Sequence, residues 1–129
     1  MKHTFLHEAE TKKALATFIL NSERLSMGAE CEAFENKFAL FQERKHAILF
    51  NSGGSANLAM IQALKNLEKI KQDDKAGFSA ITWSTNTMPL IQLGLQSIPL
   101  DCDKQTLNLS SKILLEALKE HNFKLLFLT

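Results

Sequence analysis

His46-Ala47-Ile48-Leu49-Phe50-Asn51-Ser52-Gly53-Gly54-Ser55-Ala56-Asn57-Leu58 is the stretch that decides the fold. Its apolar beginning, residues 46–50, predicts a buried strand, and the small residues that follow predict a turn into a helix. Because Gly53 and Gly54 carry no Cβ, an anion can approach the first free N–H groups of that helix. The stretch favours a phosphate site, but it is neither a P-loop nor a G-x-G-x-x-G fingerprint. Small residues at such a turn can also serve turn chemistry alone.

Composition and charge are those of an ordinary globular domain. The chain has 129 residues, 45% of them hydrophobic and 22% charged, which suits a single domain. A net charge of +1 gives no electrostatic bias towards nucleic acid or an anionic membrane, and no apolar run reaches the length of a membrane span. Cys31 and Cys102, with no signal peptide ahead of them, indicate reduced thiols in a cytoplasmic protein. The four histidines lack partners at metal-ligand spacing, so we expect no metal site.

Apolar periodicity predicts helices that alternate with short strands. Such alternation indicates parallel strands joined by right-handed crossovers, and therefore an α/β protein with a mostly parallel sheet and flanking helices. Gly94 is placed to end one helix, and Pro89 is tolerable in that helix if it falls in the first turn. The expected helices cover residues 7–20, 29–42, 54–67, 86–93 and 111–120, and the expected strands cover residues 46–50, 77–82, 97–101 and 124–128.

Two of the expected helices carry an apolar stripe with a period of 3.6 residues. We expect both stripes to face the core. The first, on residues 29–42, consists of Cys31, Phe34, Phe38 and Phe41; the second, on residues 54–67, consists of Ala56, Met60, Ala63, Leu64 and Leu67.

Trp83 follows the strand expected at 77–82, as the glycine-rich turn follows the strand expected at 46–50. Ligands gather at the carboxyl ends of parallel strands, so a phosphate cradle and an indole at one edge would suit a phosphorylated aromatic ring such as pyridoxal phosphate. The alternative is that Trp83, the only tryptophan, is a core anchor whose N–H bonds to a loop carbonyl. The residues alone leave both interpretations open.

Several motifs follow one another between Gly28 and Leu109. In this order and spacing the sequence resembles the amino-terminal part of the DegT/DnrJ/StrS family, pyridoxal-phosphate enzymes that aminate or deoxygenate nucleotide-linked keto-sugars. The resemblance implies that residues 1–129 are a single partial domain, the amino-terminal portion of the large domain of a fold-type-I transferase. The motifs are Gly28-x-x-x-x-x-Phe34-Glu35, residues 51–58, Thr82-Trp83-Ser84-Thr85-Asn86, Gly94, Pro99-Leu100-Asp101-Cys102-Asp103 and Thr106-Leu107-Asn108.

The resemblance also implies roles for single residues. The turn would bind the cofactor phosphate, and Trp83 would stack on the pyridine ring. Asp101 and Asp103 would shape a turn rather than hold a metal. The family's aspartate on the pyridine nitrogen and its Schiff-base lysine, or the histidine that replaces this lysine, match no residue here. We therefore expect the chain to carry half of a cofactor site and no catalytic residue. Whether it is active stays open. The implied cofactor-binding residues are Gly53, Gly54, Ser55, Ala56 and Trp83.

The implied function is that of a sugar aminotransferase in the biosynthesis of lipopolysaccharide or another cell-surface polysaccharide. One alternative is a 3-dehydratase of 4-keto-6-deoxy sugars. The turn, of the form Ser-x-x-x-Ala-Asn-Leu, and the Trp-Ser-Thr motif resemble the branch of the family that includes these dehydratases. Another is a non-catalytic, degenerate subunit that keeps the fold. The implied partners are a nucleotide-linked sugar and a second copy or complementing chain, because the family pairs the strand matching 46–50 with later segments.

One departure from the family concerns the start of the strand expected at 77–82. Asp73-Asp74 stands where the family has Gly-Asp, and aspartate tolerates the glycine conformation less well. Gly77 is a poor strand former. We expect a looser strand start here.

Overall fold

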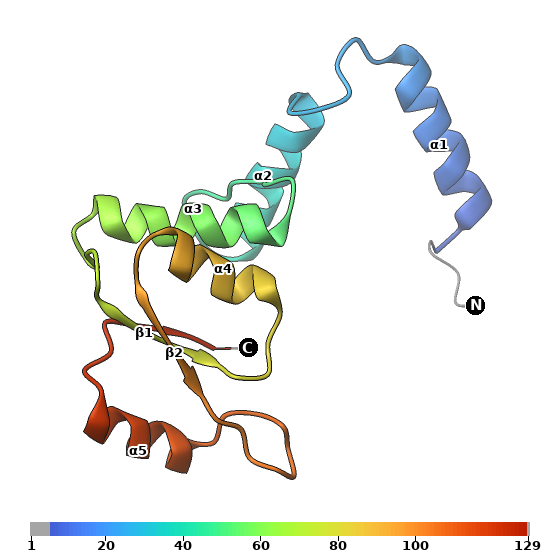
Figure 1. The fold of residues 1–129 in the computed structure, drawn as a ribbon. Coiled ribbons are helices and arrows are strands. Elements are labelled where there is room, and N and C mark those ends of the chain that lie inside the picture. Colours follow the sequence, from blue (N-terminus) through green and yellow to red (C-terminus); the bar gives the residue numbers. More distant parts are fainter. Residues whose placement is uncertain (1–5, 129) are drawn as a thin grey trace. The chain divides into compact units, whose positions relative to one another are not determined.

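The computed structural model describes residues 6–128 as two compact units that divide between Leu49 and Phe50 (Figure 1). The first unit holds helices α1 (Glu8–Asn21) and α2 (Ala29–Phe41). No helix in the described range is long and apolar enough to cross a membrane. The second unit holds α3 (Gly53–Asn66), β1 (Lys75–Ser79), α4 (Ser84–Gln92), β2 (Gln96–Leu100), α5 (Ser111–Glu120) and β3 (Leu125–Phe127).

The sheet of the second unit has three parallel strands in the order β2-β1-β3. The central strand β1 is joined to β2 through α4, and β2 is joined to β3 through α5. In Figure 1, α3 and α4 lie on one side of this sheet and α5 lies on the other. The predicted α/β fold with a parallel sheet and flanking helices is confirmed.

The core of the second unit lies between α3, α4 and the sheet. Ile61 of α3 and Leu90 of α4 are completely buried, and the cluster continues through Ile70, Ala76 and Leu95. The face predicted for α3 is correct for Leu64, which packs on this cluster, but wrong for Met60 and Leu67, which are exposed. Apolar residues cover more than one face of α3, so its periodicity alone does not select the side on which α4 packs.

The strand predicted at 46–50 is wrong, since this segment takes part in no strand pairing. The side chain of Ile48 is 71% exposed, and the Leu49 N–H donates to Glu35 Oε1 at 2.6 Å. An apolar run shows that a segment suits a strand, but a strand forms only where a neighbour supplies the hydrogen-bond ladder.

The phenylalanine stripe of α2 forms as predicted but is not a core face. Phe34, Phe38 and Phe41 are 50%, 44% and 78% exposed, and Cys31 is half-buried. The Phe34 and Phe38 rings stack with centroids 5.6 Å apart. Periodicity determines which side chains share a face, whereas their burial depends on a partner surface.

The start of β1 is closely packed rather than loose. The strand begins at Lys75, two residues before the predicted start, and Gly77 pairs with Ile98 on one side and Leu126 on the other. A Cβ on Gly77 would lie 2.9 Å from Leu126 Cδ2. The glycine is therefore required by the close approach of its neighbours. Asp73 adopts the glycine-like conformation expected at its position, with φ +64°.

Gly94 ends α4 as predicted. Its φ is +73°, and its N–H donates to the Ile91 carbonyl at 3.0 Å. The next N–H, of Leu95, donates to the Leu90 carbonyl at 2.9 Å. This pair of bonds is a Schellman motif, which needs a left-handed residue after the helix.

Candidate functional site

The glycine turn, residues 52–55, opens directly into α3. Ser52 is the N-cap, and its Oγ accepts a hydrogen bond from the Ser55 N–H at 3.2 Å. The Ala56 N–H donates to the Ser52 carbonyl at 3.1 Å. Among residues 6–128, the N–H groups of Gly53 and Gly54 have no hydrogen-bond acceptor. The amides of the first helical turn are thus divided into two that the chain uses and two that it leaves available.

Neither glycine of the turn is required by the protein's own geometry. The only glycine with a positive φ in the described part of the chain is Gly94, so the left-handed region plays no part in the turn. A Cβ on Gly53 would meet nothing within 4 Å, and one on Gly54 would make an ordinary contact of 3.5 Å with Thr85 Cγ2. What the missing side chains provide is open access to the two free N–H groups.

A cavity of about 300 Å³ lies between the first turns of α3 and α4. Hydroxyl groups from both helices gather at it, and neither helix has an acidic residue in its first turn. Helix N-termini carry a partial positive charge, so this α3–α4 cavity suits an anion better than a cation. Its lining consists of Ser52, Gly54, Ser55, Leu58, Ser84, Thr85, Met88, Pro89 and Gln92.

Trp83 is 80% exposed, so its interpretation as a core anchor is wrong. It is also not the first residue past a strand, because β1 ends at Ser79 and Trp83 is the N-cap residue of α4. Its side chain is outside the lining of the α3–α4 cavity, whereas Ser84 and Thr85, the next two residues, line it. The glycine turn and the Trp83 segment are thus brought together by contact between two helices, not by two paired strands.

Asn57 links the two helices, although no motif or periodicity in the sequence indicates this role. Pro89 is the sixth residue of α4 rather than part of its first turn, and without an N–H it leaves the Thr85 carbonyl unpaired within the helix. The Asn57 Nδ2 donates to that carbonyl at 3.2 Å and to Asn86 Oδ1 at 2.9 Å. Asn86 Nδ2 in turn donates to Thr82 Oγ1 at 2.8 Å. The sequence does indicate the need for such a donor, because a proline inside a helix leaves the carbonyl four residues earlier without its helical N–H.

The acidic pair after β2 shapes a turn, as expected. Asp103 Oδ1 accepts the N–H groups of Gln105 at 2.9 Å and Thr106 at 3.2 Å, and the Asp103 N–H donates to the Asn108 carbonyl at 2.9 Å. Asp101 Oδ1 accepts the Cys102 N–H at 2.8 Å. Within residues 6–128, no three histidine, cysteine or acidic side chains are grouped so that they could hold a metal ion.

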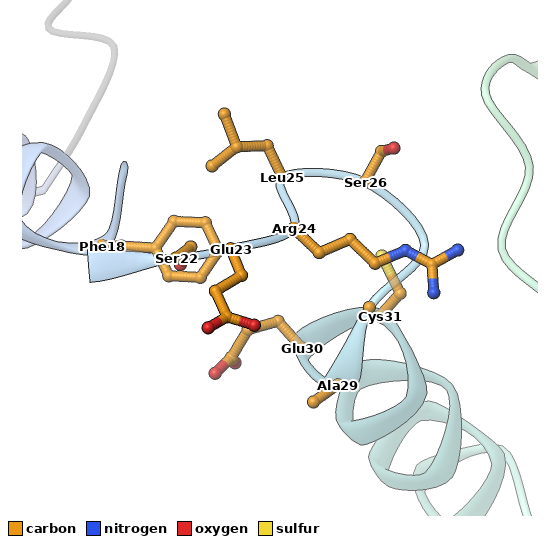
Figure 2. A pocket seen from close by; sticks show the side chains of 10 residues that line it. Phe18, Ser22, Glu23, Arg24, Leu25, Ser26, Ala29, Glu30 and Cys31 are labelled. Atoms are coloured by element: carbon orange, nitrogen blue, oxygen red, sulfur yellow. The ribbon is translucent and has the colours of Figure 1, made fainter. Parts of the chain in front are cut away.

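The first unit has a cavity of its own, of about 380 Å³, around the loop between α1 and α2 (Figure 2). In the view of Figure 2 the side chains of Glu23 and Glu30 extend to one side of the loop, and the Arg24 guanidinium extends to the other. The lining of this cavity carries charges of both signs and does not favour one kind of ligand. The α3–α4 cavity, where hydroxyl groups meet two helix N-termini, is therefore the better candidate site.

Comparison with known proteins gives the chain a family. The sequence model of the DegT/DnrJ/EryC1/StrS aminotransferase family matches residues 6–125. The GDP-4-keto-6-deoxy-D-mannose 3-dehydratase of Yersinia pseudotuberculosis is 36% identical over 104 residues, which are 79% of this chain and 26% of that protein. The chain thus spans about a quarter of the length of this curated relative.

Solved structures of related enzymes have the same fold. A crystal structure of a GDP-4-keto-6-deoxymannose-3-dehydratase (ColD) variant with bound GDP-perosamine has a TM-score of 0.77 and 34% identity, and the match covers 90% of this chain and 30% of that one. The corresponding E. coli dehydratase with bound hydrated pyridoxal phosphate has a TM-score of 0.74 and 34% identity, over 92% of this chain and 29% of that one.

Proposed function

The chain belongs to the DegT/DnrJ/EryC1/StrS aminotransferase family, and from this premise we propose that it forms part of a pyridoxal-phosphate enzyme that acts on nucleotide-linked keto-sugars. Its fold is the amino-terminal part of a fold-type-I pyridoxal-phosphate enzyme. The cofactor of this family is pyridoxal phosphate, which is present in the solved E. coli relative. When bound, this cofactor supplies an electron sink for carbanion chemistry.

The observation that supports a cofactor role for this chain is the pair of free N–H groups at the start of α3. Gly53 and Gly54 would donate them to the cofactor phosphate, and the Ser55 hydroxyl would add a third donor. The Ser55 N–H is engaged by its own cap, so this residue contributes through its side chain. The Ala56 N–H is engaged by the Ser52 carbonyl, so this residue holds the turn closed rather than donating to the phosphate.

We assign Trp83 to the pyridine ring of the cofactor. An exposed indole next to a phosphate cradle can stack on an aromatic ring, and such stacking contributes about 0.5–1.5 kcal/mol beyond the burial of area. The high exposure of the ring supports this role, because a side chain with so little protein contact adds little to the core.

For the reaction, we propose 3-dehydration of a nucleotide-linked 4-keto-6-deoxy sugar rather than transamination. Two curated relatives at 36% identity and a solved structure at 34% identity are dehydratases of this kind. The sugar aminotransferase remains the alternative, since the family as a whole is named for that activity. We further propose that the enzyme works in the cytoplasm. We also propose that it acts as a homodimer or with a complementing chain, because Ile48 and the phenylalanines of α2 expose apolar surface.

The test of the phosphate site is a titration of the isotope-labelled chain with pyridoxamine 5′-phosphate, followed by NMR. This ligand has no aldehyde and cannot react with surface lysines. The Gly53 and Gly54 amide signals should shift, whereas pyridoxamine without phosphate should leave them unchanged. Gly54→Val should abolish the shift, because its methyl groups would enter the cavity. Gly28→Ala is the matched control, since its Cβ would lie no closer than 3.8 Å to any neighbour. Equal shifts with both ligands would refute the phosphate assignment.

A further inference from the structure

We infer that Asn57 is a positioning residue for the cofactor site: it holds the start of α4, and with it Trp83, against the glycine turn. This inference rests on the proposed function and deepens it. It concerns a residue that neither donates to the phosphate nor lines the α3–α4 cavity.

The first step is that Asn57 replaces a bond that α4 cannot make by itself. Pro89 has no N–H, so the Thr85 carbonyl four residues earlier lacks its normal helical donor. The Asn57 amide donates one of its hydrogens to this carbonyl and the other to Asn86 Oδ1. Both N–H bonds of the Asn57 side-chain amide are thus donated to acceptors in the first turn of α4.

The second step is that the same turn surrounds Trp83. Asn86, held by Asn57, donates through Nδ2 to Thr82 Oγ1 at 2.8 Å, and its N–H donates to the Trp83 carbonyl at 2.9 Å. The residues on both sides of Trp83 are therefore bonded to one another, while the indole itself remains exposed. The backbone that carries the ring is fixed and the ring is available to a ligand.

The third step connects this turn to the glycine turn. A Cβ on Gly54 would lie 3.5 Å from Thr85 Cγ2, so the phosphate cradle lies beside the residue whose carbonyl Asn57 holds. Asn57 lies in the second turn of α3, one turn after the glycines. Together with the packing of Ile61 and Leu90, this one side chain therefore fixes how the proposed phosphate donors lie relative to the turn that carries the proposed stacking ring.

A purely structural role for Asn57 would be limited to satisfying the Thr85 carbonyl. Pro89→Ala separates this structural role from the positioning role, because the alanine N–H can donate to the Thr85 carbonyl within α4. In Asn57→Ala/Pro89→Ala the carbonyl is again satisfied, but the Asn57 link at this end of the helices is absent. The bond from Lys65 Nζ to the Leu93 carbonyl and the packing of Ile61 with Leu90 remain.

The experiment compares wild type, Asn57→Ala, Pro89→Ala and the double variant by thermal unfolding and by pyridoxamine 5′-phosphate titration. We expect Asn57→Ala to lower the melting temperature and the double variant to recover much of the loss. Affinity should follow a different pattern: the double variant should bind roughly tenfold more weakly than Pro89→Ala, the background that it shares. Recovery of affinity together with stability in the double variant would overturn the inference.

A ligand-free measurement tests the link even if the phosphate assignment fails. The nuclear Overhauser effect between the Gly54 α-protons and the Thr85 methyl group reports the contact between the two helices. It should persist in Pro89→Ala and weaken strongly in Asn57→Ala/Pro89→Ala. Its persistence in the double variant would overturn the positioning role. An absent response of the wild-type glycine amides to the ligand would instead refute the proposed function.

Discussion

Gly77→Ala, which adds a single methyl group to the central strand, should destabilise the second unit. The new Cβ would lie 2.9 Å from Leu126 Cδ2, 3.1 Å from Leu100 Cδ1 and 3.2 Å from Phe123 Cε1. All three distances are shorter than ordinary van der Waals contact. Leu100 is 3% exposed and has little room to move.

Two opposing contributions determine the magnitude of this effect. Inserting a methylene-sized group into a packed core typically costs about 1–3 kcal/mol. Alanine in a strand interior is favoured over glycine by roughly 0.5–1 kcal/mol. The net loss in the free energy of unfolding should therefore be roughly 1 kcal/mol, and no more than about 2.5 kcal/mol.

Urea unfolding of wild type and Gly77→Ala measures this difference directly. Leu126→Ala in the Gly77→Ala background should relieve the shortest contact, so the two substitutions together should cost less than the sum of their separate effects. Gly53→Ala is the control, because its Cβ meets nothing within 4 Å, and it should leave stability unchanged or slightly higher. A Gly77→Ala variant at least as stable as wild type would refute the packing argument.

Two further predictions concern a helix end and the exposed indole. Glu68→Gly should stabilise the chain by about 1 kcal/mol in urea unfolding, because Glu68 ends α3 at φ +55°, a conformation that costs residues with a Cβ roughly 1–2 kcal/mol; a loss of stability would contradict this. Trp83→Ala should change the melting temperature little, since the ring is 80% exposed. In a full-length or complemented protein it should weaken pyridoxal-phosphate binding by roughly tenfold, and unchanged affinity would count against the stacking role.

Local features of the sequence predicted most of the secondary structure and part of the candidate site. The helix after the glycine turn, the stop at Gly94 and the turn at Asp103 are confirmed because each depends on hydrogen bonds between residues a few positions apart. The alternation of helices and strands likewise predicts a parallel sheet, since parallel neighbours require crossover connections. The phosphate and stacking roles of the glycine turn and Trp83 remain predictions.

Tertiary structure decided the features that depend on distant partners. Segment 46–50 forms no strand because pairing requires a neighbouring strand, and the α2 phenylalanines are exposed because a stripe is buried only by another surface. Gly77 is explained by side chains from β2, β3 and the segment before β3, all far along the chain. The link from Asn57 to Thr85 spans 28 positions, and periodicity and capping patterns report only on neighbours within a few turns. The sequence by itself therefore determined most of the elements and the turn that could hold a phosphate, whereas the packing of α3 on α4 decided how that turn lies beside the start of α4, which Trp83 caps.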